Sequence, residues 1–191
     1  MKKTLISVAL AGLFGLFVNA QRNQEGVYLN QSDFEKNRLS YVSNPGTEKI
    51  KIHFNEFLDK PFITVNQNGE KSTFFKDEIF AYRHNGNVVR TWNIISYNFL
   101  ERGDIWIYSK DENVSLGKGI KRERKYYYSV TGKGEILALT ILNLKRSFPD
   151  KHQFHNFLDT QFRNDAELSR YDSYENKFKI NHILAATIFS N

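Results

Sequence analysis

Two short segments of this chain gather the residue types that could do chemistry. In LGKGIKRERKYYYSV, residues 116–130, a glycine-spaced loop leads into basic residues and three tyrosines. In PDKHQFHNFLD, residues 149–159, two histidines stand among two aspartates. Such residues could bind phosphate, calcium, another divalent metal or a polyanion.

The residues that lead into the first segment do not complete a calcium-binding loop. Three residues match the first ligand positions of a calcium-binding loop: Asp111, Asn113 and Ser115. However, Leu116 stands where that loop needs a glycine, and Arg122 stands where it needs the glutamate that closes the site. A cation at the closing position repels calcium, so we do not expect calcium here.

Gly117-Lys118-Gly119 resembles part of a phosphate-binding loop. Such a loop needs a following helix, whose first backbone N–H groups face the phosphate, and a hydroxyl residue after its lysine. Here the glycines lead into a segment with the composition of a strand, and Ile120 occurs in place of a hydroxyl residue. Nucleotide binding is therefore excluded.

The basic residues themselves are the candidates for contact with an anionic ligand: Lys118, Lys121, Arg122, Arg124 and Lys125. If 122–130 is a strand, Tyr126 and Tyr128 share a face with the two arginines, and Tyr127 lies on the other face. We expect no nucleic acid, because no RNA-binding signature accompanies this single hairpin of charge. Contact with an anionic envelope or matrix polymer, and the solvated end of an ordinary hairpin, remain as alternatives.

The histidine segment could bind a metal. On a helix that starts near residue 151, His152, His155 and Asp159 fall within about 60° of one another. Zinc needs three or four ligands, and no partner motif such as H-E-x-x-H occurs. The alternative is an exposed polar face with a weak His155–Asp159 pair, and we expect neither a metal nor another cofactor.

Catalytic chemistry finds little support in the residues. The chain has no cysteine and no G-x-S-x-G motif, so we name no catalytic residue. The adjacent acidic pairs, Asp77-Glu78 and Asp111-Glu112, would point to opposite faces of a strand. Trp92 and Trp106 could form a sugar-stacking platform, but aromatic residues more often fill the core of a small β-rich domain.

Turn signals predict the elements that would position these residues. Four turns are expected between short aromatic and β-branched runs, at Asn68-Gly69, Asn85-Gly86, Arg102-Gly103 and Gly132 to Gly134. They predict about eight or nine strands over about 49–139, joined as an antiparallel meander that forms a twisted sheet or a partly closed barrel. The 104–109 strand is apolar on both faces, which predicts burial on both sides.

The pattern becomes helical over about 140–188. Thr140 is the expected N-cap of a first helix. Asp150, with Gln153, resembles the capping box of a second helix, and a third helical piece is expected at about 165–172. The last segment, about 174–188, fits a helix or a strand. Strands followed by helices predict an α+β fold.

Residues 1–20 have the pattern of a signal peptide. Lys2 and Lys3 precede a short apolar run, and the expected cleavage lies between Ala20 and Gln21. The run is shorter than the roughly 20 apolar residues of a membrane-spanning helix. Cleavage would leave one domain, 21–191, with no transmembrane segment and with a net charge of +4 in place of +6.

Several segments, taken in order, resemble a family of uncharacterised exported proteins of Bacteroidota-type bacteria. They are GVYLNQSDFEKN (26–37), FKDEIFAYRHNG (75–86), LTILNLKRSFPDKHQFHNFLDTQF (139–162) and SRYDSYENKFKIN (169–181). The resemblance implies a periplasmic or secreted location and supplies no activity or ligand. We therefore expect a non-catalytic binding or assembly protein of the envelope or secretome, whose partner is an anionic polymer or another envelope protein. The alternative is a hydrolase that acts on an envelope or extracellular polymer.

Overall fold

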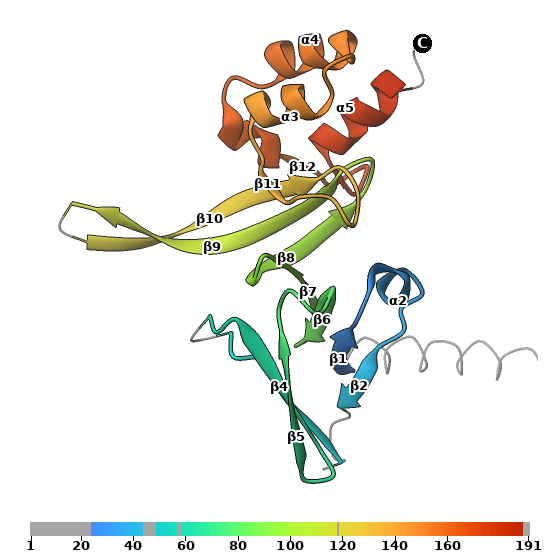
Figure 1. Cartoon of the computed structure of the whole chain (residues 1–191). Coiled ribbons are helices and arrows are strands. Elements are labelled where there is room, and N and C mark those ends of the chain that lie inside the picture. Colours follow the sequence, from blue (N-terminus) through green and yellow to red (C-terminus); the bar gives the residue numbers. More distant parts are fainter. Residues whose placement is uncertain (1–23, 44–48, 57–58, 118, 189–191) are drawn as a thin grey trace, which may run out of the picture. The chain divides into compact units, whose positions relative to one another are not determined.

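The computed structural model describes residues 24–43, 49–56, 59–117 and 119–188 (Figure 1). The predicted signal peptide and its cleavage site therefore lie outside the described residues. The chain divides into two compact units, Met1–Ser96 and Tyr97–Asn191, and each has its own hydrophobic core. The expectation of one domain over 21–191 stays a prediction. Within the described part of the chain, no helix is long and apolar enough to cross a membrane.

The first unit is built from short antiparallel strands and one short helix. Its elements are β1 (Glu25–Tyr28), α2 (Gln31–Glu35), β2 (Ser40–Ser43), β3 (Ile50–His53), β4 (Phe62–Gln67), β5 (Glu70–Phe75), β6 (Ala81–His84) and β7 (Asn87–Trp92). Four strands are ordered β2-β1-β6-β7, and a separate three-stranded sheet is ordered β3-β4-β5. Because β1 lies between β2 and β6, this part of the fold departs from the expected meander.

Two of the predicted turns are confirmed in this unit. Asn68 and Gly69 join β4 to β5, and Asn85 and Gly86 join β6 to β7, all with positive φ. Positive φ at both central residues is the geometry of a type I′ hairpin turn, which Asn-Gly favours because neither residue is strained there. A similar pair follows β7, where Asn93 and Ile94 have φ values of 48° and 62°.

The helix α2 and its flanking strands were not anticipated as elements. Asn30 caps α2, since its side chain accepts a hydrogen bond from the backbone N–H of Asp33 at 3.0 Å. Asp33 is buried and pairs with the guanidinium of Arg38. The core of this unit then forms between the two sheets' strands: Val27, Phe54, Ile63, Ile79, Tyr82 and Val89.

The second unit contains the predicted meander. Its first strands are β8 (Ile95–Arg102, which begins at the end of the first unit), β9 (Trp106–Leu116), β10 (Gly119–Ser129) and β11 (Leu137–Ala138). They pair antiparallel in the order β8-β9-β10-β11, with turns at the two remaining predicted positions. Residues 111–117 and 119–122, compared above with a calcium-binding loop, belong to the distal half of a long hairpin. Its turn lies at Gly117, where φ is +59°.

Helices follow the strands, so the α+β fold class is confirmed. The C-terminal elements are α3 (Ile141–Ser147), α4 (His152–Gln161), the 3-10 helix η1 (Asp165–Ser169), β12 (Tyr171–Asp172), β13 (Lys177–Phe178) and α5 (Lys179–Ile188). Thr140 caps α3 as predicted, and its hydroxyl accepts from the N–H of Asn143 at 3.1 Å. The capping box at Asp150 is wrong. The helix begins one residue later than the motif requires, so Lys151 is the N-cap of α4. Its ammonium group has no acceptor for a backbone N–H and makes no capping bond.

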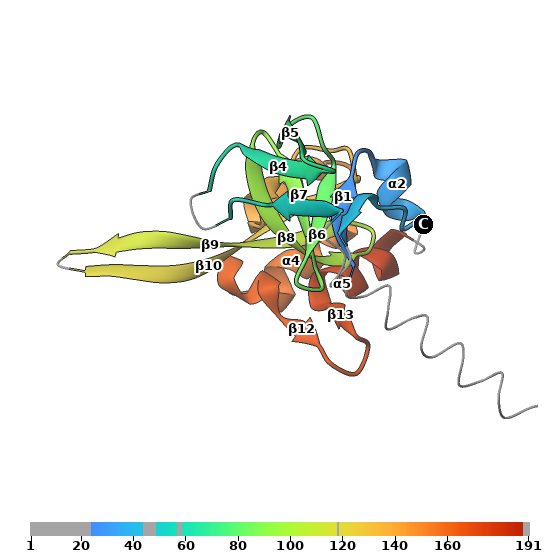
Figure 2. The same ribbon diagram turned by 90° about the horizontal axis from the view of Figure 1, so that it is seen from below.

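The helices bury one face of β9 and β10 (Figures 1 and 2). Ile107 and Tyr128 are 0 % exposed and join a core supplied by the helices, which includes Leu144, Phe154, Leu158, Leu168, Ile180 and Leu184. Trp106 and Tyr108 on the opposite face are 5 % and 0 % exposed. The predicted burial of both faces of this strand is confirmed.

Candidate binding site on the β9–β10 arm

The distal halves of β9 and β10 form an arm, defined here as residues 110–125. β8 pairs with β9 between Ser109 and Trp106, and β11 pairs with β10 at Tyr127 and Tyr128. Beyond these residues the two strands pair with each other, from Lys110–Lys125 to Leu116–Gly119. At about 3.3 Å per residue the arm is roughly 23 Å long, and it projects past the helices of its unit (Figures 1 and 2).

Ion pairs hold the arm together on one face. The carboxylate of Asp111 accepts from Nε of its cross-strand partner Arg124 at 2.9 Å, and Nη2 of Arg122 lies 3.4 Å from its other oxygen. The hydrogen bond from Arg124 holds the pKa of Asp111 below its ordinary value, and the pKa of Arg124 is raised in return. A two-stranded ribbon is marginal in water, so these pairs help to keep the arm extended.

The other face of the arm has its own pairs. Lys125 lies 3.0 Å from Glu123, and Lys110 lies 4.0 Å from Glu112. The hydroxyl of Tyr127 donates to Glu112 at 2.7 Å. Burial raises the pKa of Tyr127, and the hydrogen bond to the Glu112 carboxylate raises it further. Adjacent acidic residues therefore serve opposite faces, as the strand geometry predicts.

Positive charge is in excess at the distal end of the arm. Residues 110–125 include six Lys and Arg and three Asp and Glu, a net charge of +3. The three carboxylates form ion pairs near the base and middle of the arm, and Asp111 pairs with two guanidiniums. Lys121 has no carboxylate partner among the residues that the structure describes, and the side chain of Arg122 is 75 % exposed. Lys121, which lacks a carboxylate partner, thus lies in the distal half of the arm beside the exposed Arg122.

An apolar residue stands among these cations. Ile120 is 78 % exposed, the highest value among the exposed large aliphatic side chains of the described residues. Its cross-strand partner is Ser115, which offers it no apolar surface. Nothing in the fold of the arm requires an isoleucine here, since strand propensity is equally served by threonine.

The structure brings four of the five predicted anion-binding residues together on β10, and Lys118 lies outside the described residues. Arg122, Arg124 and Lys125 are ion-paired, whereas Lys121 is solvated. The predicted alternation of the tyrosines is confirmed. Tyr126 and Tyr128 face the helical core, and Tyr127 contacts Tyr97 on the opposite face, with ring centroids 5.0 Å apart.

The three metal-candidate residues on α4 have other partners. Nε2 of His155 lies 2.9 Å from the carbonyl oxygen of Phe148, and Asp159 accepts from Nζ of Lys145 at 2.6 Å. The weak His155–Asp159 pair is therefore wrong, and His152 contacts the ring of His155 edge-on. In the part of the chain that the structure describes, no group of three or more His, Cys, Asp or Glu residues could hold a metal ion.

The tryptophans and Glu78, which were also considered from the sequence, have structural roles. Trp106 is buried and so cannot offer a face to a sugar, and Trp92 is half-buried beside the guanidinium of Arg90. Glu78 accepts a hydrogen bond from the backbone N–H of Phe75 at 2.8 Å, which closes the turn after β5.

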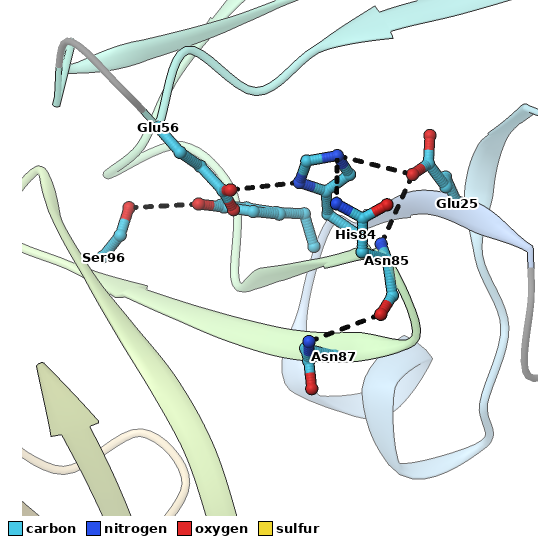
Figure 3. A network of polar contacts seen from close by, with 7 residues as sticks. Glu25, Glu56, His84, Asn85, Asn87 and Ser96 are labelled. Carbon is cyan, nitrogen blue, oxygen red and sulfur yellow. Dashed lines mark hydrogen bonds and ion pairs between the residues drawn. The ribbon is translucent and has the colours of Figure 1, made fainter.

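A polar cluster around His84 in the first unit contains none of the functional candidates named from the sequence (Figure 3). Nδ1 of His84 lies 3.0 Å from Glu56, and Nε2 lies 3.5 Å from Glu25. The imidazole stacks on Phe54, with centroids 4.5 Å apart, and the side chain of Asn85 reaches Nε2 at 3.1 Å. His84 and Glu56 are 28 residues apart in the chain, and Asn85 and Glu25 are 60 apart, so no local sequence motif indicates this cluster.

The His84 cluster resembles a base held by a carboxylate but does not complete a catalytic group. A histidine that activates a nucleophile needs one ring nitrogen free to face a hydroxyl or thiol. Both nitrogens of His84 face Glu or Asn side chains, and the hydroxyl of Ser96 instead accepts from Tyr82 at 3.3 Å. Burial raises the pKa of Tyr82 well above its ordinary value. The cluster joins β1, the segment after β3 and the β6–β7 turn.

No family model, curated protein or solved structure matches this chain. The molecule is an α+β protein whose second unit extends a cationic two-stranded arm.

Proposed function

We propose that this protein is an exported binding or assembly protein of the bacterial envelope or secretome, and that the β9–β10 arm contacts an anionic partner. The observation that carries the proposal is the excess of cations at the distal end of the arm, where Lys121 is solvated and Arg122 shares its carboxylate with Arg124. Such a concentration of charge attracts and orients an anionic partner.

The construction of the arm supports binding more than catalysis. A long, charged ribbon that leaves the body of its unit reaches a partner surface without enclosing a substrate. The His84 cluster is the place where the described residues gather carboxylates around an imidazole, and it lacks a nucleophile in contact with the ring. No specific observation favours the hydrolase alternative.

A charge reversal tests the role of the arm. The purified protein is applied to a polyanionic resin, and the salt concentration at elution is compared for the wild type and for the double variant Lys121→Glu/Arg122→Glu. The matched control is Lys71→Glu/Lys133→Glu, which makes the same change of charge at exposed residues of β5 and of the turn after β10. We expect the arm variant to elute at a lower salt concentration, with an affinity for the resin that is about ten-fold lower, equivalent to about 1.4 kcal/mol. Equal weakening in the control would show that retention reflects net charge alone and would overturn the proposal.

Export is tested separately. We expect the protein to be recovered from the periplasm or the medium, and N-terminal sequencing to start at Gln21. Recovery from the cytoplasm with residues 1–20 retained would contradict export.

A further inference from the structure

The tip of the arm combines cations with an exposed apolar side chain. Ile120 is 78 % exposed and is followed on β10 by Lys121 and Arg122. A soluble polyanion is held by the cations and gains nothing from an isoleucine. A lipid surface binds both kinds of side chain, because its headgroups attract the cations and its acyl boundary accepts the apolar side chain. We propose that the anionic partner of the arm is a lipid membrane surface, an inference that rests on the proposed function of the arm.

The geometry of the tip fits this arrangement. Ile120 and Arg122 lie on one face of β10, and Lys121 lies on the other. A tip that approaches the membrane end-on therefore brings one cation on the face of Ile120 and one on the opposite face of the ribbon. Their aliphatic stems can lie along the apolar boundary while the charges stay at the headgroups. The length of the arm, roughly 23 Å for its seven-residue strands, lets the tip reach the surface ahead of the helices of its unit.

A second copy of the chain is the competing occupant. The outer edges of the arm strands are unpaired by other strands within the described residues, and open edges can pair between molecules. Against this, both strands carry runs of charged side chains, at 110–112 and 121–125, and charged side chains are a usual protection of an edge. Pairing through an edge would also leave Ile120 exposed.

Vesicle cosedimentation tests the proposal with the whole protein. Vesicles of phosphatidylcholine alone are compared with vesicles that contain phosphatidylglycerol, at low and at raised salt. We expect binding to the anionic vesicles, with each cation near the surface contributing about a five-fold increase in partitioning. Ile120→Asn should lower partitioning about five-fold or more, whereas Leu142→Asn, at a 57 % exposed position of α3, should leave it unchanged. Ile120→Trp should bind and show a blue shift of its emission on addition of anionic vesicles.

The outcomes separate the lipid proposal from the function on which it rests. If the vesicles fail to bind while the polyanionic resin still retains the protein through Lys121 and Arg122, the lipid proposal is overturned and the proposed function stands. If neither binds, both fall. If Ile120→Asn weakens self-association in sedimentation and leaves vesicle binding unchanged, the second-copy interpretation replaces the lipid proposal.

Discussion

The side-chain amide of Asn181 pairs with both backbone polar groups of Ile105. Its Oδ1 accepts from the N–H of Ile105 at 3.0 Å, and its Nδ2 donates to the carbonyl oxygen of the same residue at 3.0 Å. Asn181 is 3 % exposed and Ile105 is 0 % exposed. One side chain of α5 thereby takes the place of a neighbouring strand at the β8–β9 turn. Nδ2 also donates to Glu101 at 2.6 Å, which binds the same turn to the helix.

Removal of this amide should be costly. Asn181→Ala leaves the backbone groups of Ile105 buried without that partner, and we expect a loss of about 2–4 kcal/mol in the free energy of unfolding. His182→Ala, at the exposed next residue of α5, should change stability by less than about 0.5 kcal/mol. Urea denaturation followed by circular dichroism measures both. Equal stability of the two variants would show that Asn181 does not hold the turn.

Gly103 is required by the same contact. A Cβ at this position would overlap the side-chain amide of Asn181. Gly103→Ala should therefore destabilise the protein by about 1–3 kcal/mol, the range of overpacking in a filled site. In the Asn181→Ala background this cost should fall, because the obstructing amide is absent. Gly119→Ala is the matched control, since nothing lies within 4 Å of a Cβ there. Additive costs in the double variant would contradict the steric explanation.

Local chemistry made part of this fold predictable. Asn-Gly turns and the Thr140 cap act within a few residues, so their patterns survive in the sequence. The Asn181–Ile105 pair joins residues 76 apart, and no propensity encodes such a contact. The length of the arm was missed for another reason. Its strands carry runs of charged residues, at 110–112 and 121–125, in place of an alternation of apolar and polar residues. The ion pair of Asp111 with Arg124 can therefore be recognised only when the register is known.

Ile94 occupies a strained turn position. Its φ of 62° lies in the left-handed region, which a β-branched residue enters at a cost of roughly 1–2 kcal/mol. Its side chain is 49 % exposed, so little packing offsets that cost. Ile94→Gly should therefore raise the free energy of unfolding by about 1 kcal/mol. Ile95→Gly, one residue later in β8, should lower it. Destabilisation by Ile94→Gly equal to that of Ile95→Gly would mean that side-chain contacts outweigh the backbone strain.

Five of the ten tyrosines should resist ionisation in the folded protein. The pKa values of Tyr28, Tyr82, Tyr97, Tyr127 and Tyr128 are all raised above the ordinary value of 10.0, chiefly by burial. A group whose pKa is higher in the folded protein contributes stability that is fully present below its pKa in the unfolded chain. This contribution is lost as the pH rises through its pKa in the folded protein.

Absorbance of tyrosinate against pH measures this effect. We expect the five residues to ionise above their ordinary pKa of 10.0, in a steep phase that coincides with alkaline unfolding. Tyr127→Phe should remove amplitude from this phase. A single phase near pH 10 that accounts for all the tyrosines, with the fold intact, would contradict the raised values.

Acid should strengthen the contact of the arm with an anionic partner. The pKa of Asp111 lies below its ordinary value of 3.8 because Arg124 donates to the carboxylate. The contribution of this pair to stability is therefore present above the unfolded pKa and is lost as the pH falls through the lower folded value. Nuclear magnetic resonance of the carboxyl carbon should place the midpoint below 3.8 in the wild type.

Protonation of Asp111 removes the charge that Arg122 and Arg124 share, so both guanidiniums become available to a ligand. Asp111→Asn should reproduce this state at neutral pH, with retention on a polyanionic resin at higher salt than the wild type. Asp77→Asn makes the same change of charge at an exposed position of the first unit and should have little effect. If Asp77→Asn strengthens retention as much as Asp111→Asn, the gain comes from net charge, and the carboxylate of Asp111 does not control the cations of the arm.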